Sequence, residues 1–360
     1  MKRSFGSVRR LSAVLLAVSA LGCTAAQAGS LYVFGDSLSD AGNNAIFLRP
    51  QHLSPSVVDG DTYVPDGPYK TGVYSNGPVW INYMAERLQD YEAAMPSRLW
   101  GGHDFAYGGA RLEKELSGND YRPSIRTQVQ TLLDQHVRIR PDDLFIVAGG
   151  GNDVRDTVLD AAAILLDPHS TDPLDVRYAR AGQLIQQRAY AFGASLSGVV
   201  AMLRGAGARQ ILVWDLPDVG LTPYARATGS SDLATQVSLA FNQAVAGYVA
   251  PIPGVTVFDV YGLIDGIVAD PDDYRLTNVE HASGNPAMHL DPDKSLFWDG
   301  IHPTTAGHRI VAETVLDAWD DVLDKVYGRE RDHDGFGHGH DDCGPSPFPG
   351  LHGPHGVGTH

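Results

Sequence analysis

A serine near the start of the chain has surroundings that suggest catalytic chemistry. Ser37 follows an apolar run at residues 31–34, in the local sequence Phe-Gly-Asp-Ser-Leu. A serine just past the end of a strand lies at the rim where α/β folds bind ligands. If a helix begins at Ser37, its backbone N–H groups point at any oxyanion formed there. The alternative, which this segment favours on its own, is that Ser37 only caps that helix.

An aspartate and a histidine three residues apart form a second candidate group near the other end. Asp299 and His302 stand in the sequence Trp-Asp-Gly-Ile-His-Pro at 298–303. Pro303 keeps His302 out of the helical region, which places both residues in a loop or turn. Such a turn can bring the Asp299 carboxylate to one imidazole nitrogen and leave the other free to take a proton from a serine. The alternative is a local hydrogen bond that only caps the final helix.

At these two segments the chain resembles the GDSL, or SGNH, hydrolase family, and two further blocks fit that family. Residues 104–110 resemble its second block, which usually has Asn where this chain has Asp104, and residues 149–153 resemble its third. The resemblance covers about residues 31–326. It implies that Ser37 is the nucleophile and that Asp299 and His302 are its relay partners. It also implies that the Gly109 amide and the Asn152 side chain are oxyanion donors, and the chemistry of the blocks adds the Ser37 amide as a third. The departure at Asp104 leaves one local hydrogen bond of its block open.

These residue types suit ester hydrolysis apart from any resemblance. The reaction needs a nucleophile, a base and donors for a developing oxyanion, and histidine as a residue type titrates in the useful range. Gly109 has no Cβ, so a substrate can approach its backbone. The alternatives are a plain Gly-Gly turn at Gly109 and a turn-forming role for Asn152. Three nearby acids are expected to orient loops without a catalytic role, namely Asp36, Asp40 and Asp153.

The elements that must position these residues alternate along the chain. Near-continuous apolar runs at 31–34, 144–148, 210–214 and 255–259 predict strands of a parallel sheet that is covered on both faces. Helical spacing of apolar residues predicts helices at 78–88, 180–204 and 305–326. The pattern predicts a three-layer α/β/α fold with a parallel sheet of about five strands, and the resemblance implies the flavodoxin-like SGNH-hydrolase fold. The GxSxG elbow of the α/β-hydrolase fold is missing around Ser37.

An irregular segment at 51–75 lies between the first strand and the first predicted helix. It is rich in Pro, Gly, Asp and Tyr, and long ordered loops in compact enzymes often form site walls. Four of its residues are expected to form the acyl or alcohol wall of the site, namely Tyr63, Pro65, Tyr69 and Tyr74.

The ends of the chain differ from the body in composition. Residues 1–28 combine a basic start, a short apolar run and an Ala-Gln-Ala site, which predicts a cleaved export signal and a secreted or periplasmic protein. A twin-arginine signal at Arg9-Arg10 and lipidation at Cys23 stay open as variants. The hydrolase domain is placed at 29–328. Residues 329–360, rich in Gly, His, Asp and Pro, predict a disordered tail whose histidines are solvated, with metal binding as the alternative at His333, His338, His340, His352 and His355.

Charge and cysteine content exclude several classes of protein. The net charge of the chain is −16, from 27 Lys and Arg and 43 Asp and Glu. Four of the basic residues lie in residues 1–28, so cleavage would leave 23 basic and 43 acidic residues. An acidic chain is a poor nucleic-acid binder, because phosphate binding needs clustered Lys and Arg. Only Cys343 remains after cleavage, so no intrachain disulfide is expected. The spacing of the body's other histidines suggests no metal site, and His308 is expected on a helix surface.

The sequence therefore predicts a secreted serine hydrolase of carboxylic esters, with lipid or small acyl esters as substrates and an acyl-enzyme intermediate. No cofactor, metal, nucleic acid or integral membrane segment of the mature chain is expected, and the oligomeric state is not predicted. The alternatives are an acyltransferase with the same triad, a carbohydrate acetylesterase, and a non-catalytic binding protein on a hydrolase scaffold.

Overall fold

The computed structural model describes residues 29–48, 52–99, 101–115 and 122–327. The predicted export signal at 1–28 and the predicted tail at 329–360 lie outside the described residues.

A parallel sheet forms the centre of the molecule. Its strands are β1 (Leu31–Gly35), β2 (Leu144–Ala148), β3 (Gln210–Trp214) and β4 (Val255–Phe258), in the order β1-β2-β3-β4. The residues of β1 and β2 are buried throughout, as predicted for strands that are covered on both faces. Alternate residues enter opposite cores: Phe34 and Phe145 face one side, whereas Val33 and Ile146 face the other.

The described residues form four strands, one fewer than the prediction of about five. On the free edge of β1, Val33 donates its N–H to the His103 carbonyl at 3.0 Å and accepts from the Phe105 N–H at 2.8 Å. This contact is a single parallel bridge between Val33 and Asp104. The Tyr107 N–H still donates to the Gly35 carbonyl at 3.2 Å, but the Gly35 N–H donates to the Gln128 side chain at 2.9 Å, so the ladder is interrupted after Val33. The position of a fifth strand is thus occupied by a segment that forms a single bridge to β1.

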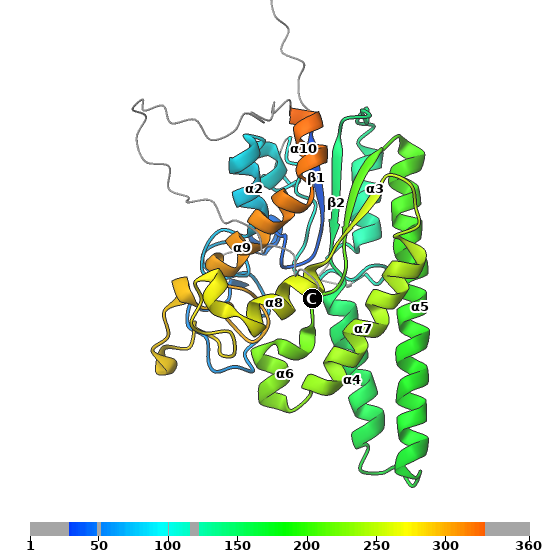
Figure 1. Cartoon of the computed structure of the whole chain (residues 1–360), viewed down its shortest axis with the longest axis vertical. Helices are drawn as coiled ribbons and strands as arrows, with labels where there is room; N and C mark the ends of the chain where they lie inside the picture. Colours follow the sequence, from blue (N-terminus) through cyan, green and yellow to red (C-terminus); the bar gives the residue numbers. More distant parts are fainter. Residues whose placement is uncertain (1–28, 49–51, 100, 116–121, 328–360) are drawn as a thin grey trace, which may run out of the picture.

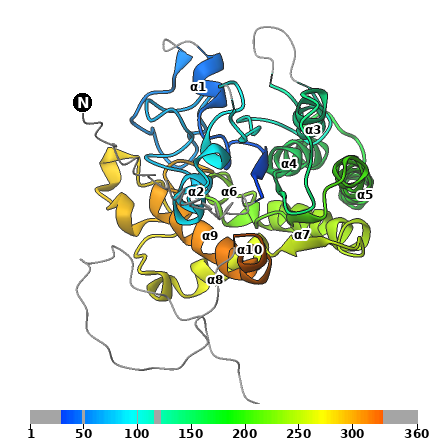
Figure 2. The same ribbon diagram turned by 90° about the horizontal axis from the view of Figure 1, so that it is seen from above.

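Helices cover both faces of the sheet, which confirms the predicted three-layer α/β/α architecture (Figures 1 and 2). The core beside Phe34 and Phe145 is closed by α3 (Ile125–Asp134), α4 (Gly151–Leu166), α5 (Leu174–Ala206) and α7 (Ser231–Tyr248). The core beside Val33 and Ile146 is closed by α2 (Trp80–Leu88), α8 (Val260–Ala269), α9 (Thr305–Ala318) and α10 (Asp320–Tyr327). Short helices lie in the connections, namely α1 (Asn43–Phe47), α6 (Pro223–Thr228) and the 3₁₀ turns η2 (Tyr91–Ala94), η4 (Val219–Leu221), η5 (Pro271–Tyr274), η6 (Pro286–Met288) and η7 (Pro292–Lys294).

The single helix predicted at 305–326 is two helices. Trp319 leaves helical geometry with φ −113° and ψ 11°, so α9 ends at Ala318 and α10 begins at Asp320. The indole of Trp319 is buried in the same core as Ile310 of α9 and Leu323 of α10. The apolar spacing continues through the break because both helices pack on one core, which is why periodicity alone does not reveal it.

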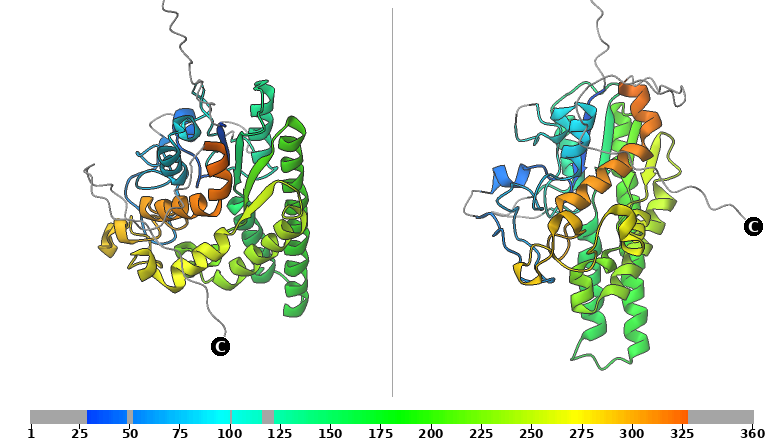
Figure 3. Two further views of the ribbon diagram at one scale, coloured as in Figure 1. Left: turned by 45° about the horizontal axis from the view of Figure 1, so that its top comes forward. Right: turned by 60° about the vertical axis from the view of Figure 1, so that its left-hand side comes forward.

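The carboxyl ends of the four parallel strands lie at one edge of the sheet, and α4 and α5 extend past that edge (Figure 3). The loops that follow β1 and β2 start there. No helix in the described part of the chain is long and apolar enough to span a bilayer.

Candidate active site

Ser37 lies in a tight turn after β1, and no helix begins at it. The Ser39 and Asp40 N–H groups donate to the Asp36 carbonyl at 3.1 and 3.0 Å, and the first helix, α1, starts only at Asn43. Both the expected helix start and the capping alternative for Ser37 are therefore wrong. The turn leaves the Ser37 side chain largely covered, with 8% of the residue exposed.

The three-residue spacing of Asp299 and His302 closes a turn of its own. Asp299 Oδ1 accepts from the Ile301 N–H at 2.8 Å and from the His302 N–H at 2.7 Å. The Trp298 N–H donates to the His302 carbonyl at 2.8 Å, and Phe297 bridges to Pro303. This small hairpin holds the imidazole beside the carboxylate as predicted, and it does not serve merely to cap α9, because Thr304 caps that helix.

The two ends of the chain meet at the imidazole. His302 Nδ1 lies 2.8 Å from Asp299 Oδ2, and His302 Nε2 lies 2.9 Å from Ser37 Oγ. Since a carboxylate can only accept, Nδ1 carries the proton and Nε2 is left to accept from the Ser37 hydroxyl. Asp299 is fully buried and His302 is 3% exposed. The low-dielectric surroundings strengthen both contacts.

A tyrosine that sequence reasoning did not connect with the histidine completes this arrangement. The Tyr69 hydroxyl donates to Asp299 Oδ2 at 2.7 Å, the same oxygen that faces His302 Nδ1. Burial and the neighbouring Asp299 carboxylate raise the pKa of Tyr69, which keeps the hydroxyl protonated as a donor. Tyr69 was expected in the wall of the site, and it lies behind the histidine instead. Its place in an irregular loop carries no spacing signal that points to Asp299.

Two of the three predicted oxyanion donors, Gly109 and Asn152, are linked through the residue that follows Gly109. Gly109 has φ +83°, a conformation that favours glycine. Asn152, the second residue of α4, donates one amide hydrogen to the Ala110 carbonyl at 3.0 Å, which leaves the second hydrogen for a ligand. Within the described part of the chain, the Ser37 and Gly109 N–H groups have no hydrogen-bond partner.

Buried acids orient the loops around these donors, as expected for Asp36, Asp40 and Asp153. Asp36 accepts from the Leu38 and Gly150 N–H groups, and Asp153 accepts from the Leu112 N–H. Asp40 accepts from the Gly108 N–H at 2.9 Å and so fixes the residue before Gly109. Burial raises the pKa of Asp40 to about 6 and that of Asp153 to about 7.

Asp104 shows how the chain accommodates its departure from the family block. Its Oδ2 accepts from the Ala41 N–H at 2.7 Å, and its Oδ1 accepts from the Ala106 N–H at 2.9 Å. An asparagine has only one side-chain oxygen, so it could accept only one of these two hydrogen bonds, and its NH₂ group would face the other N–H donor. Burial and the nearby Asp40 raise the pKa of Asp104.

A cavity of about 1090 Å³ opens in front of the serine. Ser37, Gly109, Asn152 and His302 all line it, whereas Asp299 lies behind His302. Of the predicted wall residues, Tyr63, Pro65 and Tyr74 line the cavity, and the Tyr74 ring packs against the His302 ring with centroids 5.3 Å apart. Four of the five predicted site residues thus reach one cavity from segments that are far apart in the sequence.

Other histidines lie away from this chemistry. His308, expected on a helix surface, is buried at 1% exposure in α9, and this expectation is wrong. Burial and His302 lower the pKa of His308 to about 3, so its ring is neutral. Within the described ranges, no group of three or more His, Cys, Asp or Glu residues is arranged to hold a metal ion. The tail histidines considered for metal binding lie outside those ranges.

Comparisons with known proteins agree with this geometry. An α/β/α fold with a Ser–His–Asp group beside a cavity is an arrangement that recurs among serine hydrolases. The family model described as GDSL-like Lipase/Acylhydrolase matches residues 31–315. The chain therefore belongs to the GDSL-like lipase/acylhydrolase family, and it is a carboxylic ester hydrolase.

Individual relatives are distant. A phosphatidylcholine-sterol acyltransferase of Aeromonas hydrophila is 25% identical over 343 residues, covering 79% of this chain and 88% of that protein. A GDSL esterase/lipase of Arabidopsis thaliana is 25% identical over 337 residues, covering 84% of this chain and 95% of that protein. Among solved structures, an α/β hydrolase from the metagenome of Lake Arreo, Spain, is 14% identical, with a TM-score of 0.39 and 82% and 96% of the two chains covered. That structural likeness is too loose to support an argument about function.

Proposed function

We propose that this enzyme cleaves esters by a Ser–His–Asp mechanism through an acyl-enzyme. Ser37 Oγ attacks the ester carbonyl while His302 Nε2 takes its proton, and His302 then returns that proton to the departing alcohol. A water activated by His302 releases the acid and frees Ser37. Asp299 holds the imidazole in the tautomer with the proton on Nδ1 and stabilises the imidazolium.

The oxyanion formed in each half-reaction is proposed to receive three donors, namely the Ser37 N–H, the Gly109 N–H and the free amide hydrogen of Asn152. Donors that are already in place cost no reorganisation when charge develops. The observation that carries the whole proposal is the 2.9 Å contact between Ser37 Oγ and His302 Nε2 on the wall of the cavity.

A panel of p-nitrophenyl esters from acetate to palmitate, given to the wild type and to Ser37→Ala, tests this proposal. The wild type is expected to release p-nitrophenol and Ser37→Ala to lose that activity while keeping its fold. The acetate end of the panel also tests the acetylesterase alternative, which predicts turnover of acetate esters alone. Turnover of any ester by Ser37→Ala at the wild-type rate would remove Ser37 as the nucleophile.

An alcohol is the second acceptor to consider for the acyl group. The similarity to a protein named as a phosphatidylcholine-sterol acyltransferase favours it, and the same acyl-enzyme would serve. Adding cholesterol or glycerol to the ester assay and identifying the products separates the two outcomes. A new ester would indicate acyl transfer, whereas free acid in unchanged yield would indicate hydrolysis.

The composition of residues 1–28 supports export of the protein to the periplasm or the medium. The protein isolated from either fraction is expected to begin at Gly29. Recovery of the chain from the cytoplasm with Met1 or an uncleaved start would contradict this. Ester substrates are the expected partners, and an acidic chain gives no reason to expect nucleic acid.

A further inference from the structure

A guanidinium group without a partner lies in the wall of the catalytic cavity. Asn152, Arg155 and Leu159 line the cavity together, and their spacing of three and seven residues places them on one face of α4. Among the described residues, Arg155 makes no hydrogen bond or ion pair, and its Nε is buried without a partner. A buried donor left unsatisfied is costly, so such a group calls for a ligand.

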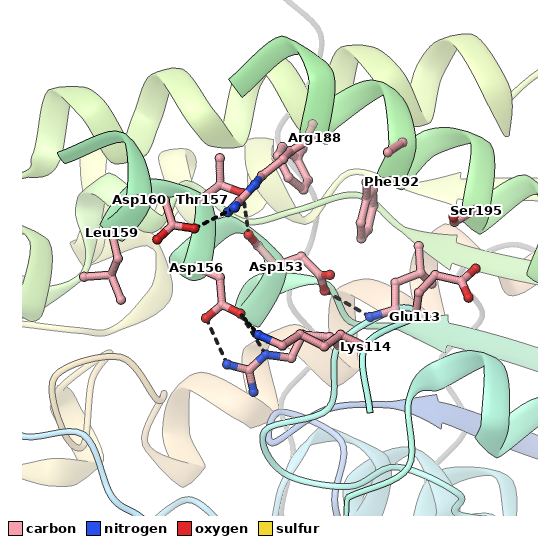
Figure 4. A pocket seen from close by; sticks show the side chains of 14 residues that line it. Glu113, Lys114, Asp153, Asp156, Thr157, Leu159, Asp160, Arg188, Phe192 and Ser195 are labelled. Atoms are coloured by element: carbon pink, nitrogen blue, oxygen red, sulfur yellow. Dashed lines mark hydrogen bonds and ion pairs between the residues drawn. The ribbon is translucent and has the colours of Figure 1, made fainter. Parts of the chain in front are cut away.

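The acid next to Arg155 in the sequence is already engaged by another residue. Arg111 donates from Nε to Asp156 Oδ2 at 3.0 Å and from Nη2 to Asp156 Oδ1 at 2.9 Å. Asp156 lies in an adjoining cleft between α4 and α5, where Lys114 Nζ also approaches it at 4.0 Å (Figure 4). Both oxygens of Asp156 therefore accept from Arg111, and Asp156 acts on the charge of Arg155 only through space, without a hydrogen bond or ion pair between the two side chains.

The cavity differs in charge from the rest of the molecule. Three arginines line it, namely Arg111, Arg122 and Arg155, whereas Asp66 is the one carboxylate among its described lining residues. The Arg122 guanidinium donates to the Gly108 and Asp66 carbonyls, so that it stands beside the second block. The chain as a whole has a net charge of −16, which makes a basic lining at this site an exception.

The guanidinium of Arg155 belongs to the same helix as the oxyanion donor Asn152, which places it near the reacting ester. The helix rises about 1.5 Å per residue, so the backbone of Arg155 lies roughly 4.5 Å along α4 from that of Asn152. Burial and the neighbouring Arg111 lower the pKa of Arg155, yet an arginine side chain stays charged in proteins. A planar guanidinium matches the two oxygens of a carboxylate or a phosphate.

We infer that Arg155 forms an anion subsite beside the oxyanion hole, and that the enzyme favours esters carrying a carboxylate or phosphate a few bonds from the scissile carbonyl. The inference rests on the proposed function, since it assigns the class of substrate to the same cavity. It makes Arg155 a specificity residue that takes no part in the proton transfers.

Two matched pairs of substrates test the subsite and identify its ligand. On the acyl side, p-nitrophenyl hydrogen glutarate carries a carboxylate that p-nitrophenyl valerate lacks. On the alcohol side, 1-butyrylglycerol 3-phosphate carries a phosphate that 1-butyrylglycerol lacks. Arg155→Gln is expected to lower kcat/KM for one or both anionic esters by about tenfold to a hundredfold, as for a lost charge-assisted hydrogen bond, and to change the neutral esters by less than about twofold.

Two further variants serve as controls. Arg155→Lys keeps the charge without the planar fork and is expected to retain part of the preference for anionic esters. Arg180→Gln removes an exposed arginine on α5 that pairs with Asp172, and it should leave all four substrates unaffected. An unchanged ratio of anionic to neutral turnover in Arg155→Gln, for both pairs, would overturn the subsite.

Binding without turnover separates this inference from the proposed function. Glycerol 3-phosphate and glutarate are titrated calorimetrically into Ser37→Ala and into Ser37→Ala/Arg155→Gln. Binding of at least one anion that weakens about tenfold without Arg155 supports the subsite, even if the wild type hydrolyses no ester and the proposed mechanism fails. Equal binding by both proteins, or binding by neither, rejects the subsite even if neutral esters are hydrolysed.

Discussion

Removing the hydroxyl of Tyr69 tests whether its hydrogen bond to Asp299 is needed to position the Asp299–His302 pair. In Tyr69→Phe the aromatic ring stays, and Asp299 Oδ2 loses a donor at 2.7 Å while keeping its contact with His302 Nδ1. A hydrogen bond to a charged group contributes about 1.5–3 kcal/mol. Asp299 keeps its Oδ1 bonds to the Ile301 and His302 N–H groups, so the carboxylate is loosened but not released.

About half of that free energy is expected to be lost in the transition state, where the Asp299 carboxylate stabilises the positively charged imidazolium. Half of that range is about 0.8–1.5 kcal/mol, which corresponds to a kcat about fourfold to twelvefold lower. The KM should change by less than about twofold, since Tyr69 is not among the residues that line the cavity in the described part of the chain. Steady-state kinetics on p-nitrophenyl butyrate, with circular dichroism to verify the fold, measures both parameters.

Tyr63→Phe is the matched control for this experiment. Tyr63 comes from the same loop and lines the cavity, and no hydrogen bond joins it to Asp299 in the described structure. Its loss is expected to change KM more than kcat. An unaltered kcat in Tyr69→Phe, or the same kinetic change in both variants, would refute the positioning role of Tyr69.

The remaining predictions concern the oxyanion hole and the buried histidine. Asn152→Ala should lower kcat on the order of a hundredfold, as for the loss of one oxyanion donor, and a loss below about threefold would exclude Asn152 from that role. Burial lowers the pKa of His308 to about 3, whereas an unfolded histidine titrates near about 6.5. Between these two values only the unfolded state takes up the proton, so the free energy of unfolding falls as the pH falls from about 6.5. Urea titrations at pH 7.5 and 5 should show wild type losing about 2 kcal/mol more than His308→Met, with the exposed His169→Gln behaving as wild type. A wild-type pH dependence in His308→Met would contradict this interpretation.

Local sequence patterns predict most of the strands and helices of the fold. The apolar runs that became β1, β2 and β3 are almost wholly buried, so their composition reflects their surroundings directly, whereas the edge strand β4 is buried only at Phe258. The edge beside β1 was harder to predict, because the Gln128 side chain takes the Gly35 N–H and the segment at Asp104 forms only one bridge to the strand. The break at Trp319 is hidden for a related reason, since packing on a shared core preserves the apolar spacing.

In the active site too, contacts within a short segment could be predicted from the sequence, whereas contacts between distant segments could not. Ser37, Asp299 and His302 stand in short segments whose order is distinctive, and the turn at Asp299 is built from its own neighbours. Tyr69 reaches Asp299 across 230 positions of sequence, and no local pattern predicts that contact. His308 follows the helical spacing of α9, but its burial depends on how α9 packs, which spacing does not specify.

The most direct test of the central claim is covalent labelling of Ser37. A serine whose proton is taken by a nearby base attacks the phosphorus of a fluorophosphonate and displaces fluoride, so the wild type should gain the mass of one phosphonyl group, located on the peptide that contains Ser37. Ser37→Ala should gain none, and His302→Ala should react about a thousandfold more slowly. A label on another residue, or labelling of His302→Ala at the wild-type rate, would contradict the activation of Ser37 by His302.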